Sequence, residues 1–509
     1  MARGLSLLFD SLLFDSLLLD SVGLRWGHGC VIALFSTPCH DLSMRIPFVS
    51  SRFLQAVVCV STILSFSSHS RAEPKKDRHV ILVSVDGLAH YYFDDPKAHM
   101  PTIRAMAAKG ARAKRMEASY PTVTWPNHTS LVTGVHAGRH GVIGNTYYDR
   151  AQNKVIPLIP DPLFDKAEIV MSPTIYDVVY GAGLTTAGVC WPASRNAATL
   201  NWQLPDVFDQ VIFEGASTPS LLTELKEKGI PYWKQNEWCK LGNAGKPQRD
   251  WMYTRIAQHL IEAHQPNFLA LHLVSVDALE HATGRQSEEA YWAVTDSDRC
   301  IRELVDSVEA AGLTDSTTFF ITADHGFITY TKEIAANNVL REEGLREGQG
   351  LKLKQQAFAL TQGGGCFIYI LDEPNREAIL KQLATRFRGV EGVEVVIEPT
   401  DFAKFGHKLP SENPHEPDLM LSAADGYSFS GKDDGAAIIL PTDGPRGSHG
   451  YSPFHDLMGA TFVAAGAGIK AGVVLDAISN TDVAPTIGAV LGVPLENTEG
   501  RVLSEIFSE

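Results

Sequence analysis

Three apolar runs, each leading into a carboxylate, constrain the fold of this chain more than any other feature. The runs are HVILVSV, NFLALHLVSV and TTFFIT, and they lead into Asp86, Asp277 and Asp324. Runs that are apolar on both faces and rich in β-branched residues are typical of strands buried in a parallel sheet. In such sheets chemistry collects at the carboxyl ends of the strands. The pattern therefore predicts that these three carboxylates gather at one edge of a parallel sheet.

Histidines accompany these carboxylates. Asp277 and His281 are four residues apart, so on a helical turn they face one way and can share a metal ion. A surface salt bridge is the alternative for that pair. Asp324 and His325 are adjacent and precede a glycine, and His449 lies in the glycine-flanked loop GSHGYSP. Together with the carboxylate after the first run, these side chains form two sets of three, which suits two zinc-like ions that each keep an open position.

The stretch YPTVTWPNHTSLVTG, residues 120–134, contains the candidate nucleophile. Pro126 suits a first helical turn and an apolar helical run follows it, so the pattern predicts Thr124 at a helix N-terminus. Such a position favours a phosphate or a developing alkoxide, although an ordinary N-cap threonine is the alternative. Two ions about 4 Å apart clamp the attacking and leaving oxygens of a phosphoryl displacement. A cation that stabilises the alkoxide would let Thr124 attack without a neighbouring general base.

The first 72 residues differ from the rest of the chain. Residues 6–20 form a near-perfect repeat, SLLFD SLLFD SLLLD, which indicates an amphipathic helix or an over-long gene start. Met44 begins a better leader, with two arginines, an apolar core and a small-residue cleavage site that ends at Ala72. We therefore expect residues 1–72 to be removed or never made, and the mature protein to be periplasmic or secreted. A membrane anchor is the alternative, but the apolar core is shorter than the ~20 residues of a span.

The charge of the remaining chain argues against one class of function. The whole chain carries −15 and residues 1–72 carry five arginines and four aspartates, so residues 73–509 carry −16. A strongly acidic protein is a poor candidate for binding polymeric nucleic acid non-specifically. The cysteines beyond the leader have the spacing of neither a zinc ribbon nor a dense disulfide framework, and their order leaves any pairing undetermined. They are Cys190, Cys239, Cys300 and Cys366.

Residues 73–509 read as one catalytic domain with an insertion. Helices are expected over residues 100–109 and 482–492, and further strands over 185–191 and 461–466. Between residues 332 and 441 the pattern loosens into a polar stretch followed by QGGGCFIYI, EAILKQLATRF and VEVVIE. We expect a β/α insertion or cap there that shapes the substrate side of a pocket.

Six motifs occur together in a characteristic order: VSVDGL, YPTVTWPNHTSLVTG, HGVIGN, D-x-x-x-H, ADHG and SHGY. In this the sequence resembles the nucleotide pyrophosphatase/phosphodiesterase family of the alkaline phosphatase superfamily, over nearly all of residues 73–509. The resemblance implies an α/β/α sandwich around a mostly parallel central sheet. It also implies two divalent metal ions, zinc in kind. One would be held by Asp277, His281 and His449, and the other by Asp86, Asp324 and His325.

The resemblance also implies roles around the nucleophile. Thr124 would contact the metals and become phosphorylated, and Asn145 would hold a non-bridging phosphate oxygen, although Asn145 could instead cap a turn. Trp125 stands where the family often has phenylalanine, and it would grip a nucleobase or else pack into the core. Glu280 stands where the family often has glycine, which changes the loop and keeps the ligands. The expected reaction is hydrolysis of a small phosphodiester or phosphoanhydride, releasing a nucleoside 5′-monophosphate.

Other functions remain as alternatives. A phosphate monoesterase would need extra cations; no Lys-x-Arg pair lies between Asn145 and Asp277, and Arg195 is the nearest candidate cation. A lipid-type phosphodiesterase stays open because the insertion does not reveal the pocket's shape. A non-catalytic anion-binding protein is disfavoured because no ligand or nucleophile is missing. The remaining histidines are expected to be structural. His128 is the first candidate for an exception, because it could orient side chains of the site. They are His90, His128, His136, His140 and His272.

Overall fold

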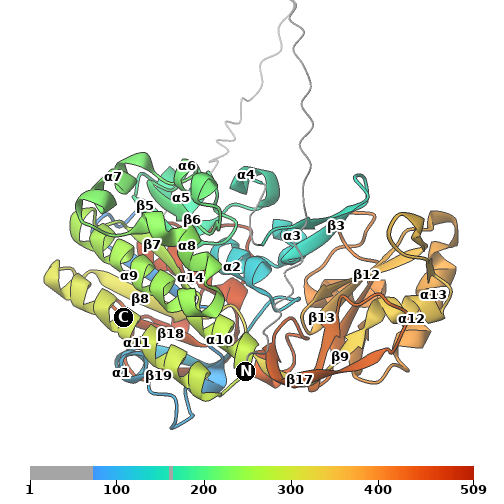
Figure 1. The fold of residues 1–509 in the computed structure, drawn as a ribbon. Helices are drawn as coiled ribbons and strands as arrows, with labels where there is room; N and C mark the ends of the chain where they lie inside the picture. Colours follow the sequence, from blue (N-terminus) through green and yellow to red (C-terminus); the bar gives the residue numbers. More distant parts are fainter. Residues whose placement is uncertain (1–72, 160–163, 509) are drawn as a thin grey trace, which may run out of the picture. The chain divides into compact units, whose positions relative to one another are not determined.

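The computed structural model describes residues 73–159 and 164–508 (Figure 1). The predicted leader, residues 1–72, lies outside the described residues. A central sheet of eight strands organises the structure. In order across the sheet the strands are β19 (Val473–Ser479), β2 (Ala111–Glu117), β18 (Phe462–Gly466), β8 (Thr317–Thr322), β1 (His79–Val85), β7 (Phe268–Leu273), β5 (Thr186–Trp191) and β6 (Trp202–Pro205).

Most strands of this sheet run parallel. Strand β1 pairs in parallel with β7 and β8, β5 does so with β6 and β7, and β19 does so with β2. Only β18 is antiparallel to its neighbours in this sheet, β8 and β2. Every residue of β1, β7 and β8 is buried, as their apolar sequences require. The predicted mostly parallel α/β fold is therefore confirmed.

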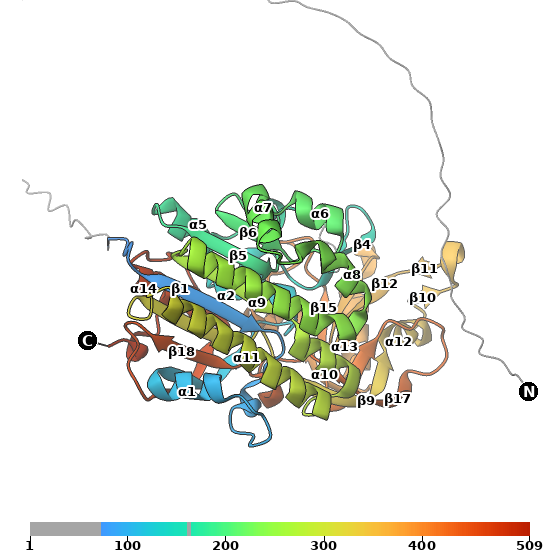
Figure 2. The same ribbon diagram turned by 60° about the vertical axis from the view of Figure 1, so that its left-hand side comes forward.

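Two groups of helices cover the sheet. In Figure 2, α9 and α11 lie on the near side of the sheet with β1 visible between them, and α1 and α10 contact α11. The other group contains α2, α5 and α14, which contact one another. The bounds are α1 (Pro101–Lys109), α2 (Thr124–Thr133), α5 (Ile175–Gly181), α9 (Lys246–Ala263), α10 (Ser275–Thr283), α11 (Glu288–Ala310) and α14 (Val483–Leu491). No helix within residues 73–159 and 164–508 has both the length and the apolar character needed to cross a membrane.

The stretch predicted as an insertion builds sheets of its own, drawn in orange in Figure 1. A four-stranded antiparallel sheet has the order β12 (Ala357–Gln362), β13 (Gly365–Ile370), β15 (Leu419–Ala423), β14 (Val393–Ile397). A three-stranded sheet has the order β16 (Gly426–Ser430), β9 (Ile328–Ala335), β17 (Ile439–Ser448). Helices α12 (Ala336–Glu342) and α13 (Arg376–Phe387) pack with these sheets around a separate hydrophobic cluster. We call residues 328–448 the cap region.

Shorter elements complete the fold. They are α3 (Ala137–His140), β3 (Thr146–Asp149), β4 (Lys154–Pro157), α4 (Lys166–Ile169), α6 (Gln210–Gly215), α7 (Pro219–Glu227), α8 (Gln235–Lys240), β10 (Arg346–Glu347) and β11 (Lys354–Gln355).

Candidate active site

The elements of the central sheet deliver the predicted ligands to one place. Asp86 follows β1, Asp324 and His325 follow β8, and α10 follows β7 and carries Asp277 and His281. Because β7, β1 and β8 are adjacent and parallel, their carboxyl ends meet at the same edge of the sheet. His449 comes from the other end of the chain, directly after β17 of the cap region.

The first predicted ligand set has the spacing of a tetrahedral metal site. Asp277 Oδ1 lies 3.3 Å from His281 Nε2 and 3.4 Å from His449 Nε2, and the two Nε2 atoms are 3.1 Å apart. Ligand atoms bound at about 2.0–2.1 Å to a tetrahedral ion are separated by about 3.3 Å. The structure therefore brings this set together with room for one ion between its three atoms.

The second set has the same spacing. His325 Nε2 lies 3.3 Å from Asp86 Oδ1 and 3.1 Å from Asp324 Oδ2. The His325 ring stacks on the ring of His449, with centroids 3.8 Å apart. The two ligand sets are therefore neighbours, as a reaction shared between two ions requires.

Hydrogen bonds fix the imidazoles in the form that binds a metal. The Nδ1 atom of His281 lies 3.0 Å from the carbonyl oxygen of Gly447, and that of His449 lies 3.0 Å from the carbonyl oxygen of Thr122. The Nδ1 atom of His325 lies 3.2 Å from the carbonyl oxygen of Gly326. Because a carbonyl oxygen only accepts, each Nδ1 carries the hydrogen, and in a neutral ring each Nε2 lone pair points into the site.

Several side-chain atoms of the two sets are buried and have no hydrogen-bond partner among the described residues. They are Asp86 Oδ1, Asp277 Oδ1, Asp324 Oδ2 and His325 Nε2. An orphaned buried polar atom costs about 1–3 kcal/mol, and more when it is charged. Four such atoms aimed at two common points are explained if cations bind there, so the residues present fit two metal ions.

The carboxylates of the two sets titrate differently. Burial, then the charges of Asp324 and Asp277, raise the pKa of Asp86 to about 7, and burial raises the pKa of Asp324 to about 6. Burial would also raise the pKa of Asp277, but the imidazoles of His281 and His449 hold it well below its ordinary value. The second set pairs two carboxylates with one imidazole, so it has the greater need of a cation.

Thr124 begins α2, as predicted, and its preceding residue Val123 is the N-cap. Its side chain is therefore not an N-cap, and its hydroxyl has no hydrogen-bond partner among the described residues. One turn later, His128 Nδ1 lies 2.9 Å from the Thr124 carbonyl oxygen and 3.5 Å from Asp324 Oδ2. Thr124, the candidate nucleophile, and the second ligand set are thus joined through one buried imidazole.

Asn145 lies beside the start of α2. Its Oδ1 accepts a hydrogen bond from the backbone N–H of Trp125 at 2.9 Å, so its side-chain NH₂ is the group left to donate. Gln362 of β12 braces this loop: its Oε1 accepts from the Asn145 N–H at 3.3 Å, and its Nε2 donates to the Thr146 carbonyl oxygen at 2.7 Å. The sequence did not reveal this role of Gln362, which comes from the cap region.

Trp125 is buried. Its side chain is 1% exposed and packs in a cluster with Ala137, Val142, Ile143 and neighbouring apolar residues. Of the two roles that the sequence left open, this burial supports packing over stacking on a base.

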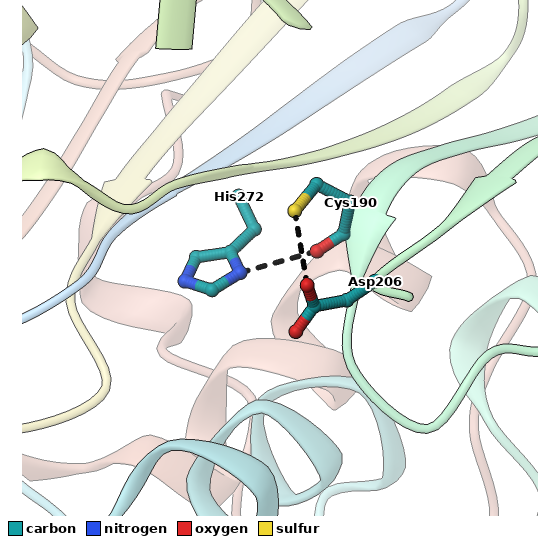
Figure 3. Close-up of side chains that lie close together, drawn as sticks. All are labelled: Cys190, Asp206 and His272. Atoms are coloured by element: carbon teal, nitrogen blue, oxygen red, sulfur yellow. Dashed lines mark hydrogen bonds between the residues drawn. The ribbon is translucent and has the colours of Figure 1, made fainter. Parts of the chain in front are cut away.

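His272 supports the second ligand set from behind. Its Nε2 lies 3.0 Å from Asp86 Oδ2. Its Nδ1 lies 3.1 Å from the Cys190 carbonyl oxygen, the contact that Figure 3 draws. Burial would lower the pKa of His272, but Asp86 and Cys190 raise it well above its ordinary value. The sequence predicts a structural histidine here, and the only signal against that is its place in the otherwise apolar run FLALHL.

The thiol of Cys190 does not complete a third ligand set with Asp206 and His272. Cys190 Sγ lies 3.5 Å from Asp206 Oδ1, and Arg249 Nη2 lies 3.8 Å from that sulfur and 3.5 Å from that oxygen (Figure 3 draws the first pair). The buried guanidinium already supplies the positive charge there. All four cysteines in the described residues are free thiols.

The other candidate cation and histidines lie in ordinary contacts. Arg195 Nε donates to Asp165 Oδ1 at 2.9 Å. His90 bonds to the Gly459 carbonyl oxygen, His136 to Ser119 Oγ and His140 to Ser130 Oγ.

The central sheet and its ligand-bearing edge define an alkaline-phosphatase-like fold. The family model of type I phosphodiesterase/nucleotide pyrophosphatase matches residues 80–452, and the chain belongs to this family. It is therefore a hydrolase of phosphoric ester or anhydride bonds.

Individual relatives agree with this placement. Ectonucleotide pyrophosphatase/phosphodiesterase family member 7 of Mus musculus is 22% identical over 449 residues, which cover 87% of this chain and 90% of the relative. A venom phosphodiesterase of Macrovipera lebetinus is 27% identical over 248 residues, 48% of this chain and 25% of the relative. The solved structure of murine ectonucleotide pyrophosphatase/phosphodiesterase 5 superposes with a TM-score of 0.64 at 18% identity, covering 85% of this chain and 100% of that one.

Proposed function

We propose that this protein is a two-metal phosphodiesterase/nucleotide pyrophosphatase that works through a phosphothreonine at Thr124. The observation that carries the proposal is the pair of ligand sets. Their possible metal-binding atoms lie at the separations of tetrahedral coordination, and several of these atoms have no hydrogen-bond partner among the described residues. Both sets join the nucleophile segment, since His449 bonds to the Thr122 carbonyl and His128 links Thr124 to Asp324.

The proposed ligands keep the predicted division. Asp277, His281 and His449 would hold one divalent ion, and Asp86, Asp324 and His325 would hold the other. Mixed imidazole and carboxylate sets of three suit zinc, with a position open for substrate. When bound, the ions would neutralise the phosphoryl oxygens and favour the alkoxide form of the threonine hydroxyl.

Side chains and backbone amides of the chain have separate roles in the proposed reaction. Thr124 Oγ1 loses its proton and attacks phosphorus, and the leaving group departs with its bridging oxygen and takes up a proton. The phosphorylated threonine keeps the other ester group of the substrate. Water later cleaves its threonine–phosphorus bond, which restores the hydroxyl and releases the phosphate monoester. The Asn145 amide donates to a non-bridging oxygen, since its carbonyl end is engaged by the Trp125 N–H. The N-terminal amides of α2 add favourable dipoles for the anion. The His281 side chain is 43% exposed, so the proposed site is open to solvent on the side of His281.

We propose small nucleotide esters or anhydrides as substrates, with a nucleoside 5′-monophosphate as product. Related proteins carry pyrophosphatase/phosphodiesterase names, and an inactive variant of the murine structural neighbour was solved with AMP. A monoesterase is less well supported, because Arg195, its candidate cation, is paired with Asp165. We also propose a periplasmic or secreted location through the leader ending near Ala72, which the names ectonucleotide pyrophosphatase and venom phosphodiesterase support.

A substrate panel tests the choice between diester and monoester. We expect kcat/KM for an aryl methyl phosphodiester to exceed that for the aryl phosphate monoester by about tenfold or more. The monoester carries an extra negative charge, and Arg195, the candidate cation to meet it, is already paired with Asp165. The measurement is kcat/KM for both substrates on one zinc-loaded preparation. A preference for the monoester would reverse the ranking of the two functions.

Replacing Trp125 by alanine tests how the base is bound. We expect kcat/KM to fall by the same factor for a nucleotide ester and for a small aryl phosphodiester, together with a clear fall in Tm. The reason is that removing a buried tryptophan costs about 3–5 kcal/mol of stability. Trp292→Ala is the control, because that side chain is 50% exposed. A loss of about tenfold confined to the nucleotide would instead assign base stacking to Trp125.

A further inference from the structure

A cluster of two imidazoles and one carboxylate lies apart from the catalytic ligands. Glu224 belongs to α7, His259 belongs to α9, and His264 is the C-cap of α9. Glu224 Oε2 lies 2.8 Å from His259 Nε2 and 2.6 Å from His264 Nε2. One possible ligand atom from each residue lies within 4.8 Å of the other two.

This cluster sits at the far edge of the central sheet. His264 comes before β7, whereas Asp277 comes after it. The ring of His264 packs on that of Trp202, the first residue of β6, with centroids 4.4 Å apart. Since β6 and β7 both run parallel to β5, their starting ends lie together, opposite the catalytic edge.

Glu224 differs from exposed glutamates such as Glu237 and Glu391 in pairing with two histidines. Glu237 pairs with Lys234, and Glu391 pairs with Lys332. In the part of the chain that the structure describes, Glu224 forms ion pairs with two histidines and with no lysine or arginine. A lysine or arginine side chain brings only donors, but an imidazole can release its hydrogen and offer a lone pair. The cluster differs in this respect from the pair of Cys190 and Asp206, where the Arg249 guanidinium already supplies the positive charge.

We propose that Glu224, His259 and His264 form a further metal site, for Zn²⁺ or a similar transition-metal ion, that ties α7 to α9. Two imidazole nitrogens and one carboxylate oxygen are a ligand set for such ions. The ion competes with the imidazole hydrogens for the same three atoms, which are hydrogen-bonded at 2.6 Å and 2.8 Å in the structure. Binding requires these separations to widen toward about 3.3 Å. The Glu224 side chain is 31% exposed and is free to make that movement.

Metal analysis of the tag-free full chain tests this site. Wild type and Glu224→Gln are equilibrated with excess Zn²⁺ at pH 7.5, dialysed together against one free-zinc concentration, and analysed for zinc per chain. We expect Glu224→Gln to hold one equivalent less than wild type and to keep its diesterase kcat. Glu227→Gln, which removes the same charge from an exposed position on α7, is the matched control and should hold the wild-type amount.

The test compares zinc content between wild type and variants. Its result is therefore independent of how many ions the proposed catalytic sites hold. His264→Gln provides the second variant if Glu224→Gln does not fold, and it should lose the same equivalent. A second readout is Tm: added Zn²⁺ should raise the Tm of the diesterase-active wild type by a few degrees more than that of Glu224→Gln. Equal zinc content in wild type and both cluster variants would overturn the proposal, and so would an equal loss in Glu227→Gln.

Discussion

Replacing Thr124 by alanine is expected to abolish turnover while the zinc content stays at the wild-type level. The alanine variant keeps the six ligand side chains and the start of α2, and it loses only the hydroxyl that would attack phosphorus. Removing the nucleophile of a covalent mechanism lowers kcat by about 1,000-fold or more. The measurement pairs kcat for an aryl methyl phosphodiester with zinc analysis of the same sample.

Two further variants make that result specific. Thr124→Ser keeps a hydroxyl at the same atom and should retain part of the activity. Thr133→Ala removes a buried hydroxyl from the other end of α2, where it bonds to the Thr129 carbonyl oxygen, and should leave kcat within a few fold of wild type. The methyl phosphoryl group of that diester, trapped on the protein after an acid quench, should appear in wild type and vanish in Thr124→Ala. Substantial kcat in Thr124→Ala would exclude it as the nucleophile.

The fold could be predicted from the sequence wherever a strand is buried on both of its faces. TTFFIT is apolar on both faces and forms β8 with the bounds predicted for it, and the helix expected over residues 100–109 is α1. Strand β2 was missed because its sequence, ARAKRME, mixes charged and small residues. It is a strand because β18 and β19 pair with it, and those partners lie more than 300 residues further along the chain. Pairing over such separations leaves no local pattern.

The site could be predicted where chemistry alone identifies a residue. Adjacent carboxylates and imidazoles at strand ends are typical of ion-binding sites, so the sequence alone selects Asp86, Asp324 and His325 as candidate ligands, and the structure brings them together. It does not give the direction of a side chain. Trp125 and His272 are both buried, but one faces an apolar cluster and the other faces Asp86. Which neighbour each meets depends on the packing of distant elements, as it does for Gln362 and Asn145.

Replacing His449 by alanine is expected to remove about one zinc equivalent and to lower kcat/KM by about 100-fold or more. His449 is the candidate ligand that the chain supplies from furthest away. Three contacts hold it: its Nδ1 meets the Thr122 carbonyl, its Nε2 faces His281 and Asp277, and its ring stacks on His325. Truncation would therefore leave the first set with two ligands and remove packing from the second.

The matched control is His455→Ala, which alters a histidine six residues further along the same loop that pairs with the exposed Asp425. It should keep both its zinc and its activity, because His455 faces no member of either ligand set. Zinc titration separates the two explanations for a loss in His449→Ala. A weakened ligand set predicts that activity recovers partly as free zinc rises, since the missing interaction is affinity for the ion. A histidine that only shaped the loop predicts wild-type zinc content and no recovery, and that outcome would remove His449 from the metal ligands.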